Sequence, residues 1–379
     1  MEKTRLLPAE SLNHDHHNSN LYSPEYVQIS SAAAITLGMM QGLMHRTACT
    51  HCLNLLLTYP EGCRANCSYC GLARHREESR AYQDRNFIRV HWPSLSLKDI
   101  IQRVKNGADG AAFERMCISM ISHPRANEDT FNILEQWVAQ LSHIPVSILS
   151  NPTTLSYADL VLLKQLGADI FTVALDAVTP GIFERTRGKT VQSPHRWDKY
   201  WQTIHWAAEI FGPEKFGAHL ICGMGETEQE ILQIVQQIYV MGGHSHMFAF
   251  FPERGSLMED WEAVPFDQWR RVQLARFLID YRQISIKDMG FNAQGQVIDF
   301  GINPQELTAL IDTGKPFRTS GCPGKHDPEI SACDRPYGDS TPQQIRSYPF
   351  PLMKLDVRRV KQQLGDISPG FTPKSRNES

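Results

Sequence analysis

Three cysteines lie close together on one short stretch of the chain, at Cys63, Cys67 and Cys70, with the spacing CxxxCxxC. Three thiolates on one short loop can bind three irons of a 4Fe–4S cube and leave the fourth iron open for a substrate. A zinc site normally takes four ligands, and a disulfide framework would not place three cysteines so close together in a long, cysteine-poor chain. The spacing therefore predicts an iron–sulfur site, and an accidental trio or a structural metal is the alternative.

The loop EGCRANCSYCGLAR, residues 61–74, resembles the signature of the radical SAM superfamily. The resemblance implies that the open iron chelates the amino and carboxylate groups of S-adenosylmethionine. One electron from the cluster would then cleave it to methionine and a 5′-deoxyadenosyl radical. Tyr69, just before the third cysteine, is expected beside the adenine. A non-enzymatic iron–sulfur or zinc interaction module is a rival interpretation from another class.

Composition excludes several classes of function. The 379 residues carry 38 Lys and Arg against 41 Asp and Glu, so the net charge is close to zero. The chain lacks the excess of basic residues that is typical of nucleic-acid-binding proteins. No apolar run is long enough to span a membrane. The N-terminus lacks the charged region followed by an apolar region that is typical of a signal peptide. We therefore expect a cytoplasmic protein that binds neither nucleic acid nor membrane, with cysteines that are ligands or buried thiols.

Apolar runs alternate with segments of helical spacing after residue 50. We expect strands at 53–58, 116–121, 146–149, 170–175, 218–222 and 247–251, and helices at 97–104, 128–141, 157–166, 197–211, 228–241 and 266–282. This alternation predicts an α/β fold with a parallel sheet, closed partly into a (βα)6 barrel of the radical SAM type. The three-cysteine loop follows the first strand, and active sites of parallel barrels lie at such carboxyl ends.

Extensions precede and follow the predicted barrel. We expect an N-terminal extension at 1–48, the barrel at 49–300 and a C-terminal extension at 301–379 that carries two further cysteines. The first 30 residues are polar and predicted to be irregular, and the histidines among them are expected in a solvated leader rather than a metal site. A short helix is expected at 31–46, and the tail from 368 is predicted to be disordered.

A glycine turn follows the fifth predicted strand, in the sequence ICGMGETEQE. Gly223 and Gly225 would let the backbone approach a ligand, and Glu226 lies at the start of the next helix. Alone, this pattern is a weak signal, because an ordinary helix start looks the same. Together with the three-cysteine loop it resembles the superfamily motif that contacts adenine.

A polar segment follows the fourth predicted strand. In this superfamily an acid here often binds the ribose hydroxyls, and a nearby arginine binds the carboxylate of S-adenosylmethionine. The resemblance places Asp176 and Arg187 in these roles, with Arg185 as the rival arginine. The alternative is a helix-capping aspartate with exposed arginines.

Four further thiols lie outside the predicted strands, two before the first and two in the tail: Cys49, Cys52, Cys322 and Cys333. Barrel closure brings the first and last elements together, so these four cysteines could form a second site. A structural zinc site is the alternative. Buried free thiols explain Cys117 and Cys222 equally well.

The pattern CTHCLNLLLTYPEGCRANCSYCGL, with SGCP and CDRPY in the tail, resembles the two-component lipoyl synthases of the biotin-synthase-like branch. The resemblance implies that the four further cysteines hold an auxiliary 4Fe–4S cluster that donates sulfur to an octanoyl-lysine on a lipoyl carrier protein. It also implies a second synthase subunit and an electron donor such as ferredoxin or flavodoxin. The alternative is another enzyme of this branch, an isomerase, methylase or other sulfurtransferase, with a structural metal in the tail.

Two features of the sequence bear on this auxiliary site. Residues 323–332 separate the two tail cysteines by more than the resemblance leads us to expect, which indicates an inserted loop or a different ligand. Cys52 and Cys63 are eleven residues apart, at most roughly 36 Å if the chain is extended. The strand between them could place the CTHC segment at the opposite end of the barrel, where it would serve a structural site unless the segment bends back.

Overall fold

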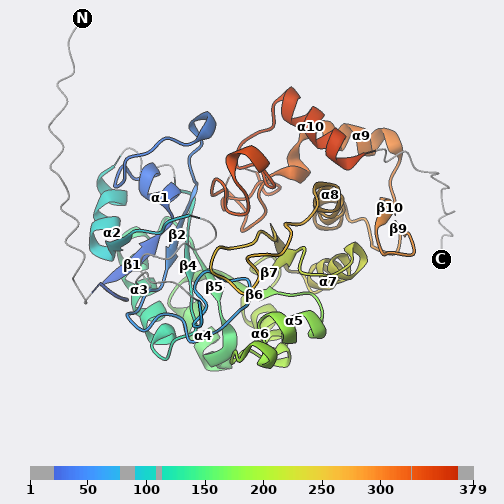
Figure 1. The fold of residues 1–379 in the computed structure, drawn as a ribbon. Helices are drawn as coiled ribbons and strands as arrows, with labels where there is room; N and C mark the ends of the chain where they lie inside the picture. The colour runs from blue at the N-terminus through green and yellow to red at the C-terminus, as the bar shows by residue number, and fades with distance from the viewer. Residues whose placement is uncertain (1–20, 77–89, 108–112, 326, 366–379) are drawn as a thin grey trace, which may run out of the picture.

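The computed structural model describes residues 21–76, 90–107, 113–325 and 327–365. Six parallel strands form the centre of the fold, each paired with the next along the chain (Figure 1). They are β2 (Cys52–Leu56), β4 (Arg115–Ser119), β5 (Val146–Ser150), β6 (Ala168–Asp176), β7 (Phe216–Cys222) and β8 (His244–Ala249). The predicted α/β class and the six strands are confirmed.

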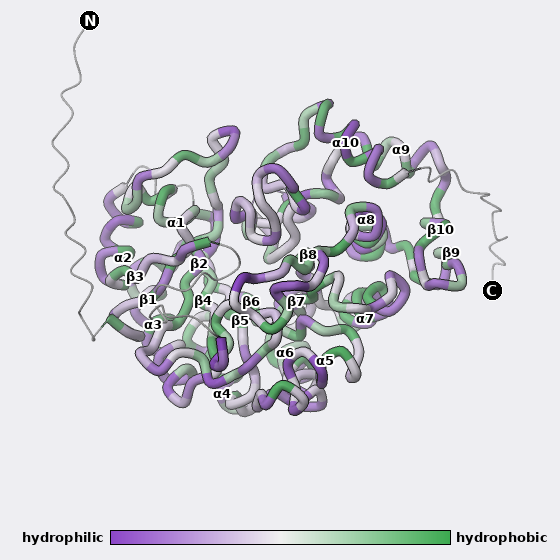
Figure 2. The backbone as a smooth tube through the Cα atoms, viewed as in Figure 1, coloured by the Kyte–Doolittle hydropathy of each residue, from purple (hydrophilic) through white to green (hydrophobic). Residues whose placement is uncertain are grey.

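Helices connect these strands and pack on the outside of the sheet (Figure 1). They are α2 (Leu97–Asn106), α3 (Ala126–Leu141), α4 (Tyr157–Gln165), α5 (Pro180–Thr186), α6 (Trp197–Phe211), α7 (Glu228–Val240) and α8 (Phe266–Arg282). Reciprocal capping boxes begin α4 at Ser156 and α7 at Thr227, because each hydroxyl and the acid three residues later satisfy each other's backbone N–H groups. Figure 2 shows β2 and β4 as a largely apolar region, whereas hydrophilic residues colour the outer loops.

Two short antiparallel strands extend the sheet beyond β2. They are β1 (Tyr26–Ile29), which pairs with β2, and β3 (Ser94–Ser96), which pairs with β1. The prediction that the first 30 residues are irregular is therefore wrong at residues 26–29. These four residues form a strand because they pair with the edge of β2. The helix expected at 31–46 is shorter than predicted: α1 covers Ser31–Thr36.

The described part of the C-terminal extension, residues 301–325 and 327–365, packs against the barrel through helices and an irregular segment. After the hairpin of β9 (Gly290–Phe291) and β10 (Val297–Asp299) come α9 (Pro304–Thr313), a long irregular segment, and α10 (Lys354–Leu364). The irregular segment crosses from β8 to β2, two strands that do not pair with each other. The histidines at 14, 16 and 17 and the tail from 368 lie outside the described residues. None of the described helices is both long and apolar enough to cross a membrane.

Candidate active site

A cavity of about 250 Å³ lies inside the barrel. Three of its lining thiols, Cys63, Cys67 and Cys70, follow the carboxyl end of β2. Four more come from the amino end of β2, from β4 and from the C-terminal extension: Cys52, Cys117, Cys322 and Cys333. Between them the wall is largely apolar, with Leu56, Ile121, Leu149, Ile221 and Phe248. One hollow therefore opens onto seven of the nine cysteines of the chain.

The three-cysteine loop is held in place by backbone hydrogen bonds to two neighbouring segments. The N–H of Arg64 donates to the carbonyl of Ser122 at 2.7 Å, and the N–H of Ser68 donates to the carbonyl of Thr186 at 2.7 Å. Backbone N–H groups also point at two of the sulfurs, from Ala65 to Cys63 at 3.4 Å and from Leu72 to Cys70 at 3.4 Å. Three thiols on a fixed loop, with amide donors on two of their sulfurs, fit a 4Fe–4S cube that keeps one open iron.

Burial sets the protonation of these thiols. It raises the pKa of Cys63 and Cys70, and it raises the pKa of Cys67 to about 11 although the nearby Arg187 opposes the shift. Without iron the thiols are therefore protonated at neutral pH. A coordinating thiol is deprotonated, so loading of iron must release protons at this loop.

Tyr69, Asp176 and Arg187 meet in the cavity wall. The Asp176 carboxylate accepts from the Tyr69 hydroxyl at 2.5 Å and from Arg187 Nη1 at 2.6 Å. Arg187 is 2% exposed and also donates to the hydroxyl of Tyr200 at 2.9 Å. The structure thus brings together the three residues that the sequence analysis chose for S-adenosylmethionine, whereas Arg185 is exposed. Their contact with the cofactor stays a prediction.

The glycine turn between β7 and α7 has a positive φ at Gly223 and Gly225, +110° and +102°. Glu226 bends back over this turn, and its carboxylate accepts from the N–H groups of Gly223 and Met224. Gly223, Gly225 and Glu226 do not appear among the described residues that line the cavity. Glu226 therefore fixes the shape of the turn. The contact of this turn with adenine stays a prediction.

Three of the four thiols predicted for the auxiliary site lie in the same cavity. The side chain of Asn54 donates to Cys52 Sγ at 3.5 Å and to Cys333 Sγ at 3.8 Å, so it joins β2 to the tail. Cys322 accepts from the Ser147 hydroxyl at 3.1 Å. Cys49 is not placed with them: it lines a separate hollow beside α1. A cysteine of β4, Cys117, takes part in the cavity wall instead.

The segment between CTHC and the three-cysteine loop does not bend back. Cys52 begins β2 and Cys63 follows its carboxyl end, and five strand residues span about 17 Å. Both ends of β2 nevertheless open into the same cavity. An extended strand can thus present one set of thiols at each end of a common hollow.

Sequence reasoning missed several polar residues of this wall. Asn54 could have been found, because it lies two residues after Cys52 on the same face of a strand. Arg335, in the CDRPY motif, is 7% exposed and lines the cavity with Trp92. Its guanidinium lies 5.2 Å from the centre of the Trp92 ring. The pattern gave no signal that this arginine points inward.

Residues 57–238 match the model of the radical SAM superfamily. The chain carries a radical SAM domain. Among solved structures, methylornithine synthase (PylB) is similar at 15% identity over 61% of this chain and 61% of its own, with a TM-score of 0.43. HydG, a maturase of the [FeFe]-hydrogenase, is similar at 14% identity over 60% of this chain and 49% of its own, with a TM-score of 0.47. No curated protein matches the chain.

The match of the radical SAM model begins just after β2 and ends within α7, so it contains the three-cysteine loop and the glycine turn. Cys52 and the C-terminal extension lie outside it. A radical SAM domain implies a 4Fe–4S cluster and S-adenosylmethionine. The thiols of Cys63, Cys67 and Cys70 are the residues that fit this cluster.

Proposed function

We propose that this chain is a sulfur-inserting radical SAM enzyme, one subunit of a two-component lipoyl synthase. Its substrate would be an octanoyl chain in amide linkage to a lysine of a lipoyl carrier domain. The observation that carries the proposal is the shared cavity: three thiols at the carboxyl end of β2 and a second group of thiols at its amino end face one largely apolar hollow. A second iron–sulfur cluster in that group would lie within reach of a chain held between them.

The residues of the chain have distinct tasks in this proposal. Cys63, Cys67 and Cys70 hold the first cluster. When bound, that cluster and S-adenosylmethionine supply a radical that removes hydrogen from a carbon of the substrate, and the second cluster supplies the sulfur. The apolar wall, including Leu149 and Phe248, binds the alkyl chain, orients it and excludes water.

Two partners and an electron donor complete the proposed reaction. The carrier domain presents the octanoyl-lysine, the second synthase subunit inserts the other sulfur, and a ferredoxin or flavodoxin supplies electrons. The near-neutral charge of the chain suits protein partners rather than nucleic acid. The proposal places the reaction in the cytoplasm.

The proposal is tested by mass spectrometry of an octanoyl-lysine peptide from a carrier domain. The peptide is incubated without oxygen with the reconstituted chain, S-adenosylmethionine and dithionite, with and without the second subunit. We expect a gain of one sulfur together with 5′-deoxyadenosine, and loss of both in the variant C63A/C67A/C70A. A methylated or isomerised product, or 5′-deoxyadenosine with no sulfur gain even when the second subunit is present, would contradict sulfur insertion.

A further inference from the structure

We infer that Cys52, Cys117, Cys322 and Cys333 are the ligands of the second iron–sulfur cluster, that Cys49 is not a ligand, and that Arg335 balances the negative charge of this cluster. The inference deepens the proposed function and rests on it, since it assigns the ligands of the proposed sulfur donor. These four cysteines are called the inner thiols below.

Strand register brings the first two inner thiols to one face. Side chains two apart on a strand point the same way, and Cys52 and Asn54 both line the cavity. Cys117 on β4 is the direct partner of Asn54 in the parallel ladder. Cys117 therefore lies beside Asn54, whose amide donates to the sulfurs of Cys52 and Cys333.

The tail supplies the other two inner thiols through a closed loop. The N–H of Ala332 donates to the carbonyl of Cys322 at 3.0 Å, so residues 323–331 leave and return to the same place. Cys333 is also close to Gly321, where an added Cβ would lie 3.6 Å from Cys333 Sγ. The long spacing between the tail cysteines therefore does not separate them in space.

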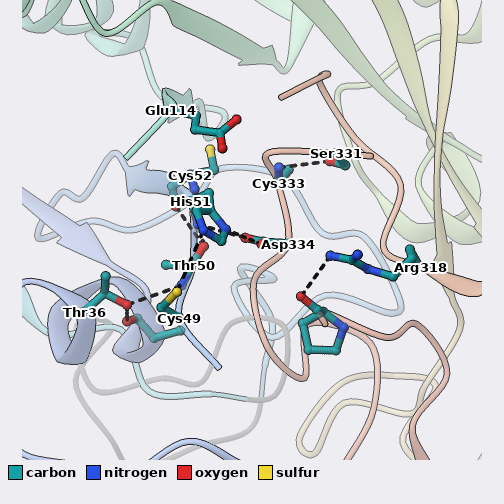
Figure 3. Close-up of polar contacts among 12 residues, drawn as sticks. Thr36, Cys49, Thr50, His51, Cys52, Glu114, Arg318, Ser331, Cys333 and Asp334 are labelled. Atoms are coloured by element: carbon teal, nitrogen blue, oxygen red, sulfur yellow. Dashed lines mark hydrogen bonds and ion pairs between the residues drawn. The ribbon is translucent and has the colours of Figure 1, made fainter. Parts of the chain in front are cut away.

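A hydrogen-bonded pair fixes the tail to the start of β2 and turns Cys49 away. Asp334 accepts from the backbone N–H of His51 at 2.8 Å and contacts His51 Nδ1 at 2.5 Å. In Figure 3 the sulfurs of Cys49 and Cys52 lie on opposite sides of His51. Cys49 lies next to His51 Nε2, at 3.9 Å, and faces the hollow near Leu43. It cannot join the inner thiols without a rearrangement of CTHC.

The charge of the wall favours an anionic occupant. Arg335 is buried in the cavity wall, and its Nη1 has no hydrogen-bond partner within the described chain. A buried guanidinium nitrogen that lacks a hydrogen-bond partner is costly unless an anion meets it. Four thiolates around an iron–sulfur cube supply that anion, and the donors from Asn54 and Ser147 would stabilise its sulfurs.

The spread of the thiols suits a cube better than one ion. Zinc draws its four ligands to one point, whereas a cube binds each cysteine at a different corner. Within the described ranges, no three His, Cys, Asp or Glu side chains converge in a way that could hold a single metal ion. The test must therefore count iron and zinc separately.

The test uses the full chain with C63A/C67A/C70A as the background, so that only the second cluster is counted. After anaerobic reconstitution with iron and sulfide, iron, sulfide and zinc are measured and Mössbauer spectra are recorded. We expect about four irons per chain in this background, the content of one 4Fe–4S cube. C49A should retain this content. C117A should lose at least half of it or show a three-iron cluster.

Cys222 gives a matched control, because it is also a buried strand cysteine but does not line the cavity among the described residues. C222A should keep the iron content of the background, and circular dichroism of every variant without metal checks that the fold is retained. Loss of iron in C49A, or full retention in C117A, would overturn the ligand assignment and leave the second cluster standing. Zinc, or no iron, in the background would overturn the second cluster itself.

Arg335 is tested separately by the reduction potential of the second cluster in the same background. Removal of a buried positive charge stabilises the oxidised cluster, so R335Q should lower the midpoint potential while the iron content stays the same, and R335K should restore it in part. An unchanged potential in R335Q would overturn the charge-balancing role.

Discussion

At the scale of residues, the candidate site depends on buried polar groups that satisfy one another. Arg187 is the central one: it binds Asp176, the hydroxyl of Tyr200 and the carbonyls of Ala174 and Leu175. Such a network holds its members in one orientation, because each lost partner leaves a buried group without a hydrogen bond. The wall near the three-cysteine loop is therefore rigid before any ligand binds.

Arg187→Ala should lower the free energy of unfolding by about 3 kcal/mol, since it leaves the Asp176 carboxylate, the Tyr200 hydroxyl and two backbone carbonyls without their buried partner. Urea denaturation of the chain without metal measures this. The exposed neighbour Arg185 is the control, and Arg185→Ala should change the free energy of unfolding by less than about 0.5 kcal/mol. Equal effects of the two substitutions would contradict the network.

Gly223→Ala should destabilise the glycine turn by at least about 1 kcal/mol, because φ is +110° there and an added Cβ would lie 2.6 Å from Val264 Cβ. Gly181→Ala, in α5, meets nothing within 4 Å and should be neutral or stabilising by up to about 1 kcal/mol. Thermal unfolding of both variants checks the difference, and a Gly223→Ala protein as stable as the parent would disprove the strain.

At the scale of elements, the tail is tied to the segments that precede β2. Besides the contact between His51 and Asp334, both terminal nitrogens of Arg46 donate to the Asp356 carboxylate of α10, at 2.6 and 2.9 Å. Burial alone would raise the pKa of Asp356, but the hydrogen bonds from Arg46 lower it below the ordinary value. A lowered pKa in the folded state means that this pair stabilises the fold above the unfolded pKa.

Arg46→Gln should therefore cost about 1 kcal/mol at pH 7. The cost should begin to shrink as the pH falls below about 4, the ordinary pKa of an aspartate, and should vanish once the pH is below the lowered pKa of Asp356 in the folded state. Chemical denaturation across this range measures the difference from the parent. The exposed pair of Lys361 with Asp312 is the control, so Lys361→Gln should show little effect at either pH. A cost that persists unchanged at acid pH would show that Arg46 acts through packing.

The sequence predicted the six strands from short apolar runs, and the helices around them, except the short α5, from apolar residues at helical spacing. It did not predict β1 or the packing of the tail, since both depend on partners distant in the chain. The same holds for the thiols. Spacing grouped Cys49 with Cys52, but only the strand register shows that Cys117 faces inward, as Asn54 does on the next strand.

At the scale of the whole molecule, the tail closes a barrel that its strands leave open. Ser320 accepts from the N–H of Met247 on β8 at 2.7 Å, and Asp334 accepts from His51 just before β2. The segment between them carries two inner thiols into the gap. The fold thus completes the barrel wall and supplies part of its chemistry with the same piece of chain.

The measurement that tests the central claim most directly uses heavy-isotope sulfide. The chain is reconstituted with labelled sulfide and incubated with the octanoyl-lysine peptide, S-adenosylmethionine, dithionite and the second subunit in unlabelled form. We predict that the sulfur added by this chain carries the label and that 5′-deoxyadenosine forms with it. Product in which all the sulfur is unlabelled, or 5′-deoxyadenosine with no sulfur in the peptide, would contradict a sulfur-donating cluster in this cavity.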